Sequence, residues 1–257
     1  MVADGYRAVP IAECGEPLVA IPDGQFAFTD PPPYMALGAP YSGASPWMLR
    51  QRVRDALLAA GRFLEDRQPG WRLKLFDAYR PVPVQAFMVW REFQRLAEGA
   101  GRSLAAFADP ADLARRDPDL HATLAATVFT FWGVPSEDPR TPPPHSTGAA
   151  VDLTLQDAGG YDLDMGCPID ETTERAHPGF FAAATGPDGR ACHEHRRLLN
   201  DVMTAAGFSR HANEWWHFSL GDQMAAFSRG EPVAIFGRAA GPDGWRPGPV
   251  GRFRRDV

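Results

Sequence analysis

The chain has 257 residues, of which 44% are apolar and 23% charged, as expected for one globular domain. It contains no apolar run of about 18 residues, which excludes a transmembrane helix. The net charge of −6 argues against nucleic acid or an anionic membrane surface as a partner, and three scattered cysteines provide neither a disulfide framework nor a zinc ribbon.

The N-terminal segment has no basic stretch followed by an apolar one, so no secretory signal is apparent and a cytoplasmic location is the default expectation. No internal repeat and no long linker divides the chain. We therefore expect a single domain over 1–257, with a loop-rich part at 1–45 and an irregular tail at 237–257. The sequence carries no signal for an oligomeric state.

The first predicted elements are a short strand at 25–29, a helix, and a second strand at 71–77 with alternating apolar residues. Ser45 and Pro46 have the residue types of a helix N-cap and first helical position. Apolar residues then recur at spacings of three and four, which predicts that this helix runs to about Asp66.

The middle of the chain predicts a helix over 84–96, a short helix around 104–107, and a strand over 149–155. Residues 121–131 are apolar without a clear period, so they fit either a helix or a strand. A proline-rich loop at 133–144 precedes the strand.

Residues 161–190 read as a long irregular segment, followed by a helix over 193–206 that ends at Gly207. Residues 208–220 are strand-like. Because strands and helices come in runs and do not alternate strictly, we expect an α+β fold, with a small, mainly antiparallel sheet flanked by helices.

The first chemically suggestive cluster spans residues 144–152. His145 ends the proline-rich loop, and Asp152 lies inside an apolar strand, where burying a carboxylate is costly unless something compensates its charge. A metal ion would compensate Asp152 and would explain a histidine seven residues upstream.

A second cluster, at 213–218, places Glu214 and His217 among aromatic residues. His217, with His145 and Asp152, completes a set of two histidines and one carboxylate, which matches a catalytic zinc with an open fourth position. Glu214 then suits a general base. Residues three apart point to opposite faces of a flat strand, so we predict a distortion near Trp215.

Arg80 follows the strand at 71–77 and could stabilise an oxyanion if it faces the metal. Taken singly, each candidate has an ordinary alternative: Arg80 as a surface residue, His145 as a surface or capping residue, Asp152 as a turn cap. Two histidines at 193 and 195 lie two apart on a helix, so they cannot share a metal from it.

These residues together resemble the VanX-type D-alanyl-D-alanine dipeptidases, zinc peptidases that share their fold with the hedgehog signalling domain. The matching stretches are Asp77-Ala78-Tyr79-Arg80-Pro81, His145-x-x-Gly148-x-Ala150-x-Asp152-Leu153-Thr154-Leu155, Asp164-Met165-Gly166, Ile169-Asp170, Glu214-Trp215-Trp216-His217 and the helical run from Arg196 to Phe208. The resemblance covers roughly residues 45–220.

The resemblance implies one zinc ion bound by His145, Asp152 and His217, with Glu214 as catalytic base and proton shuttle. It further implies that Arg80 stabilises the tetrahedral intermediate. By the same resemblance Asp170 would meet the substrate ammonium, and Tyr34 would contact the substrate. The resemblance also implies a small dipeptide, D-Ala-D-Ala, as the substrate, and a link to peptidoglycan metabolism.

One position departs from the family pattern: Pro143 stands where a serine is common, so the substrate contact of that serine must be made otherwise. Two other functions stay open. One is a D,D- or L,D-carboxypeptidase that trims peptidoglycan stem peptides, and the other is a metal-binding module without catalysis. The presence of Glu214 favours catalysis, because a purely structural zinc site needs no spare base.

Overall fold

The computed structural model describes residues 5–240. Its strands are β1 (Leu18–Ala20), β2 (Ala27–Phe28), β3 (Met48–Arg50), β4 (Arg72–Asp77), β5 (Ala150–Gln156), β6 (Ser209–Arg210) and β7 (His217–Ser219). Its α-helices are α1 (Pro33–Ala36), α2 (Gln51–Arg67), α3 (Val82–Gly99), α4 (Pro110–Arg116), α5 (Pro118–Phe131), α6 (Pro187–Ala205) and α7 (Gln223–Arg229). Short 3-10 turns are η1 (Gly5–Ala8), η2 (Pro144–Thr147) and η3 (Glu174–Ala176).

The central sheet has five strands in the order β2-β4-β5-β7-β6. Only the β2–β4 pair is parallel, and the other pairs are antiparallel. A separate antiparallel ribbon joins β1 to β3. The predicted α+β class with a small, mainly antiparallel sheet is confirmed.

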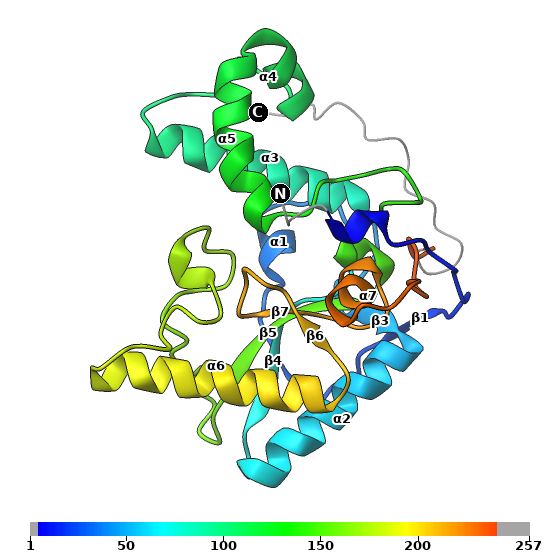
Figure 1. Ribbon diagram of the computed structural model, residues 1–257, viewed down its shortest axis with the longest axis vertical. Helices are drawn as coiled ribbons and strands as arrows, with labels where there is room; N and C mark the ends of the chain where they lie inside the picture. Colours follow the sequence, from blue (N-terminus) through cyan, green and yellow to red (C-terminus); the bar gives the residue numbers. More distant parts are fainter. Residues whose placement is uncertain (1–4, 241–257) are drawn as a thin grey trace.

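One face of the sheet carries the larger apolar core, which α2 and α6 cover as they lie side by side (Figure 1). Leu153 and Leu155 of β5 belong to this core, together with Leu57 of α2 and Val202 of α6. Each such fully buried side chain contributes roughly 1.5–3 kcal/mol through the hydrophobic effect. This core leaves the opposite face of β5 available for polar side chains.

A second apolar cluster lies among α3, α4 and α5, on the far side of the sheet from α2 and α6 in Figure 1. Phe93 of α3 and Val128 of α5 are completely buried in it. The functional residues lie between these two cores, where α3 and the end of α5 approach the polar face of the sheet.

The predictions of β2, β4, β5 and α3 are confirmed, with ends that shift by a few residues. The helix α6 is also present, but it begins at Pro187, so the end of the segment 161–190 is helical and not irregular as predicted. Gly207 ends α6 as expected, in a left-handed conformation with φ of 96°.

The predicted start of the first helix is wrong, because α2 begins at Gln51. The Ser45 hydroxyl accepts a hydrogen bond from the Trp47 amide at 3.1 Å and forms a local turn instead of a helix cap. Residues 48–50 pair with β1. Leu49 is buried as expected, although it lies in β3 and not in the helix. Its spacing of four residues to Val53 is compatible with a helix face and with a strand face.

The short helix predicted at 104–107 is also wrong, since those residues form a turn and part of a loop. The helices of this region are α4 and α5, and they begin instead at Asp-Pro pairs. The Asp109 and Asp117 side chains accept hydrogen bonds from the amides of residues three positions on, and a proline follows each as the first helical residue. The ambiguous stretch 121–131 is therefore helical.

The strand predicted at 208–220 is interrupted, because only β6 and β7 are strands and a loop at 211–216 separates them. Helix α7 was not predicted, although Asp222 caps it. Residues 237–240 form no helix or strand, and the rest of the predicted irregular tail lies outside the described residues. Within residues 5–240, no helix combines the length and apolarity needed to cross a membrane.

Candidate active site

Three acidic or imidazole side chains lie in line across adjacent strands of the sheet. Asp152 in β5 is the register partner of Asp77 in β4 and of His217 in β7. A register shift between Leu75 and Asp77 brings Asp77 opposite Asp152. Side chains of direct partners in adjacent strands share a face, and the neighbouring Leu153 points into the core, so Asp152 and His217 face the other side.

His145 reaches this line from the short turn η2, which follows the proline-rich loop. The turn ends at Gly148, whose φ of 70° is left-handed. The Nδ1 atom of His145 lies 2.7 Å from the Ala78 carbonyl oxygen, to which it donates. The Arg80 amide in turn donates to the His145 carbonyl at 3.3 Å. The turn is thus fixed to the end of β4, and the His145 Nε2 atom remains free for other partners.

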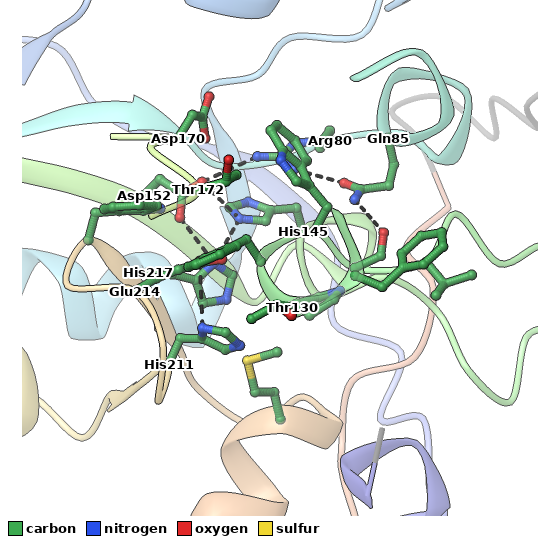
Figure 2. A pocket seen from close by; sticks show the side chains of 18 of the residues that line it. Arg80, Gln85, Thr130, His145, Asp152, Asp170, Thr172, His211, Glu214 and His217 are labelled. Carbon is green, nitrogen blue, oxygen red and sulfur yellow. Dashed lines mark hydrogen bonds and ion pairs between the residues drawn. The ribbon is translucent and has the colours of Figure 1, made fainter. Parts of the chain in front are cut away.

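Figure 2 shows the rings of His145 and His217 turned toward the Asp152 carboxylate. His145 Nε2 lies 3.1 Å from both Asp152 Oδ2 and His217 Nδ1, and His217 Nδ1 lies 3.0 Å from Asp152 Oδ1. One donor atom from each residue falls within 4.8 Å of the other two. All three side chains are buried.

The chemistry of this donor set fits a divalent metal ion. The second ring nitrogens of the two histidines are occupied, by the Ala78 carbonyl for His145 and by the Ser219 hydroxyl at 3.2 Å for His217. With those nitrogens protonated, the two that face each other carry lone pairs. Burial also lowers the pKa of His217, which favours its neutral form. The lone pairs of His145 and His217 and the Asp152 carboxylate therefore point to the same position, where a cation would bind favourably.

Glu214 lies beside this group, with Oε2 3.8 Å from His217 Nδ1. The loop at 211–216 breaks the strand, and the Trp215 amide donates to the Ala176 carbonyl at 3.1 Å instead of to a neighbouring strand. The predicted distortion near Trp215 is confirmed. Burial, with the charges of Asp152 and Asp170, raises the pKa of Glu214 well above its usual value. This shift favours the protonated form of the carboxyl, which suits a group that gives up a proton as well as accepting one.

Arg80 is buried, which excludes the ordinary alternative of a surface arginine. Its Nε donates to Asp77 Oδ2 at 2.9 Å and its Nη1 to Gln85 Oε1 at 2.8 Å. Its Nη2 lies 3.0 Å from the Tyr34 hydroxyl and 3.2 Å from Asp152 Oδ2. The guanidinium is therefore held in one orientation, with one edge toward the metal-ligand group.

Tyr34 and Asp170 extend the site on the far side of Arg80. The Tyr34 hydroxyl donates to the Asp170 carboxylate, whose two oxygens lie 3.0 and 3.1 Å away. Burial raises the pKa of Asp170 to about 7, although the positive charge of Arg80 opposes the shift. Burial also raises the pKa of Tyr34 well above its usual value, so its hydroxyl remains a donor.

The structure brings all the predicted site residues together. Arg80, His145, Asp152, Asp170, Glu214 and His217 line one cavity, and Tyr34 contacts it through Arg80 and Asp170. Pro143 is buried but does not line the cavity, whereas the neighbouring Pro144 does.

Three further residues of the site were not predicted. Gln85 links Arg80 to the Gly133 carbonyl, which its Nε2 meets at 2.6 Å. Trp132 lies over the guanidinium of Arg80, 5.4 Å from the ring centre. His211 lies with Nδ1 3.7 Å from Glu214 Oε2. Of these three residues, only His211 could have been suggested by the sequence, because it is an ionisable side chain three residues before Glu214.

Comparisons with known proteins agree with this geometry. A family model described as D-Ala-D-Ala dipeptidase, of the M15 peptidases, matches residues 28–231. A protein of Synechocystis named D-alanyl-D-alanine dipeptidase is 39% identical over 91% of this chain and 96% of its own length. Proteins of the same name from Escherichia coli and Enterococcus faecium are 32% and 37% identical, over 65% and 60% of this chain and 65% and 64% of their own. The chain belongs to the M15 peptidase family of D-Ala-D-Ala dipeptidases.

Proposed function

We propose that this protein is a zinc-dependent dipeptidase that hydrolyses free D-Ala-D-Ala to two molecules of D-alanine, as part of peptidoglycan metabolism. The observation that carries the proposal is the convergence of His145, Asp152 and His217 on one point, with Glu214 beside it. The choice of D-Ala-D-Ala as the substrate rests on membership of the dipeptidase family.

One zinc ion per chain fits the donor set, because two imidazoles and a carboxylate leave a fourth position for water or substrate. When bound there, zinc acts as a Lewis acid that activates water and polarises a peptide carbonyl. His145, Asp152 and His217 would supply its protein ligands.

The position of Glu214 beside the metal-ligand group supports a role in proton transfer. We assign it the role of accepting a proton from the attacking water and delivering it to the amine of the departing D-alanine. Burial of the carboxyl raises its pKa and so supports the second step, in which it acts as an acid.

Arg80 and Asp170 suit the charges that a dipeptide presents. The fixed guanidinium of Arg80 would stabilise negative charge on the carbonyl oxygen as the tetrahedral intermediate forms. The Asp170 carboxylate, oriented by the Tyr34 hydroxyl, would bind the free ammonium of the substrate. A blocked amino terminus would leave the partly buried Asp170 carboxylate without its ammonium partner, which favours free dipeptides over stem peptides. The cytoplasmic location and the absence of nucleic-acid or membrane partners stay predictions.

The test compares substrates on zinc-loaded protein: free D-Ala-D-Ala, L-Ala-L-Ala, and a stem peptide that ends in acylated D-Ala-D-Ala. We expect release of D-alanine from the free D,D-dipeptide alone, and its loss in Glu214→Gln. Cleavage of the stem peptide instead would make the protein a carboxypeptidase. Bound zinc without cleavage of any substrate would contradict the dipeptidase function and favour a binding module.

A further inference from the structure

Glu92, Arg95 and Thr172 form a closed group of hydrogen bonds beside the active site. The Thr172 hydroxyl donates to Glu92 Oε1 at 2.8 Å. Arg95 donates from Nε and Nη2 to the two oxygens of Glu92, at 2.7 Å each, and its Nη2 lies 2.7 Å from the Thr172 oxygen. Each member of the group therefore contacts the other two.

The position of this group connects helix α3 to the segment that carries Asp170. Glu92 lies on α3 and is only 6% exposed, whereas Thr172 lies two residues after Asp170 and lines the same cavity. The Arg95 side chain is more than half exposed, so solvent screens its charge. The hydrogen bond between Glu92 and Thr172 is therefore the main link between α3 and this segment.

Helix α3 thus reaches the Asp170 segment at two points. At its N-terminus, Arg80 precedes the helix and bonds to the Tyr34 hydroxyl, which donates to Asp170. Three turns further along, Glu92 accepts from Thr172. The helix therefore sets the spacing between the two attachments, because its rise per residue is fixed.

Asp170 needs such support because its backbone is in the left-handed region, with φ of 68°. A non-glycine residue pays a conformational penalty there, smaller for aspartate than for most residues, and the surrounding contacts help to hold it. The hydrogen bond from Tyr34 fixes the carboxylate, and the Thr172–Glu92 bond fixes the backbone that follows.

We propose that Glu92 is a positioning residue, which holds residues 170–172 so that the Asp170 carboxylate is set in place for the substrate ammonium. This inference rests on the proposed role of Asp170 in the dipeptidase. Glu92 contacts neither the metal ligands nor the reacting peptide bond, so it acts on substrate binding and leaves the chemical step to other residues.

The kinetic test compares Glu92→Ala and Thr172→Val with the conservative variants Glu92→Gln and Thr172→Ser. Loss of one orienting hydrogen bond should raise KM for D-Ala-D-Ala by about five- to tenfold, with kcat little changed. Glu92→Gln and Thr172→Ser retain the oxygen or hydroxyl and should restore most of the affinity. Glu98→Gln, an exposed residue on the same helix, is the matched control.

Two results separate positioning of Asp170 from general loosening of the fold. In an Asp170→Asn background, Glu92→Ala should have little further effect on kcat/KM. In a crystal structure of Glu92→Ala, the Asp170 carboxylate should move away from the Tyr34 hydroxyl. An unchanged KM, additive losses in the double variant, or an Asp170 that keeps its contact with Tyr34 would each overturn the inference. If the unaltered protein fails to cleave D-Ala-D-Ala, the proposed function fails, while the crystal structure still decides the role of Glu92.

Discussion

The imidazole of His217 has a different partner at each nitrogen, with Nε2 3.2 Å from the Ser219 hydroxyl. Both residues belong to β7, two positions apart, so their side chains share one face of the strand. The Ser219 hydroxyl oxygen accepts a hydrogen bond from the Nε2–H group, which leaves the Nδ1 lone pair directed at Asp152 and His145.

Replacing Ser219 with alanine should therefore weaken metal binding without removing a ligand. Removing the hydrogen-bond partner of a ligand histidine typically lowers metal affinity by about 10- to 100-fold, and we expect a loss in that range. Competition with a chromophoric chelator measures it. Ser209→Ala, in the neighbouring strand β6, is the control and should bind metal normally. Equal affinities of both variants would show that Ser219 does not set the tautomer of His217.

Arg80→Lys should lower kcat by about 100-fold or more, the usual loss for one donor to a developing oxyanion. Lysine keeps the charge but cannot reproduce the separate contacts to Asp77, Gln85 and Tyr34. Metal content, measured in the same preparation, should stay at the value for the unaltered protein. Arg91→Lys, an exposed arginine on α3, serves as control. A near-normal kcat in Arg80→Lys would exclude oxyanion stabilisation by the guanidinium fork.

The raised pKa of Asp170 predicts a pH dependence of both stability and substrate binding. A carboxyl whose pKa rises to about 7 on folding favours the folded state at low pH, and that contribution is lost as the pH rises through 7. Asp170→Asn should therefore stabilise the metal-free chain more at pH 8 than at pH 5, as urea denaturation measures.

Substrate binding should have the opposite dependence, because only ionised Asp170 attracts the ammonium group. KM for D-Ala-D-Ala should fall as the pH rises through about 7, and Asp170→Asn should lose this part of the profile. A variant with the same KM profile as the unaltered protein would assign the ammonium to another residue.

Gly148→Ala should destabilise the fold by about 2 kcal/mol or more. The residue has φ of 70°, and an added Cβ atom would overlap the Leu18 side chain. Because Gly148 ends the turn that holds His145, metal affinity should fall as well. Gly99→Ala is the control, since its Cβ would meet no atom within 4 Å and its backbone is not left-handed. Equal denaturation midpoints of the two variants would contradict this prediction.

The metal-ligand group could be predicted from the sequence because histidine and aspartate are common metal ligands and these three stand out in apolar surroundings. Asp152 within an apolar strand needs a counter-charge, and only His145 and His217 offered neutral donors in comparable apolar surroundings. The break near Trp215 followed from strand geometry alone. These inferences needed no knowledge of which strands are neighbours.

The residues that support the site could not be predicted in this way. Gln85 and Thr172 become relevant only once α3 lies against the loops at 133 and 170, which tertiary packing decides. The start of α2 was placed wrongly for a related reason, since pairing of β3 with β1 overrides the local helix signal at Ser45. Long-range contacts determine both outcomes.

The most direct measurement follows D-alanine release while zinc is added stepwise to metal-free protein. Activity on D-Ala-D-Ala should rise in proportion to zinc and level off at about one ion per chain, as one group of His145, Asp152 and His217 requires. Glu214→Gln should bind the same amount of zinc and release about 1,000-fold less D-alanine or lower still. Full activity without metal, or one bound zinc with no activity in the unaltered chain, would contradict a zinc-dependent dipeptidase.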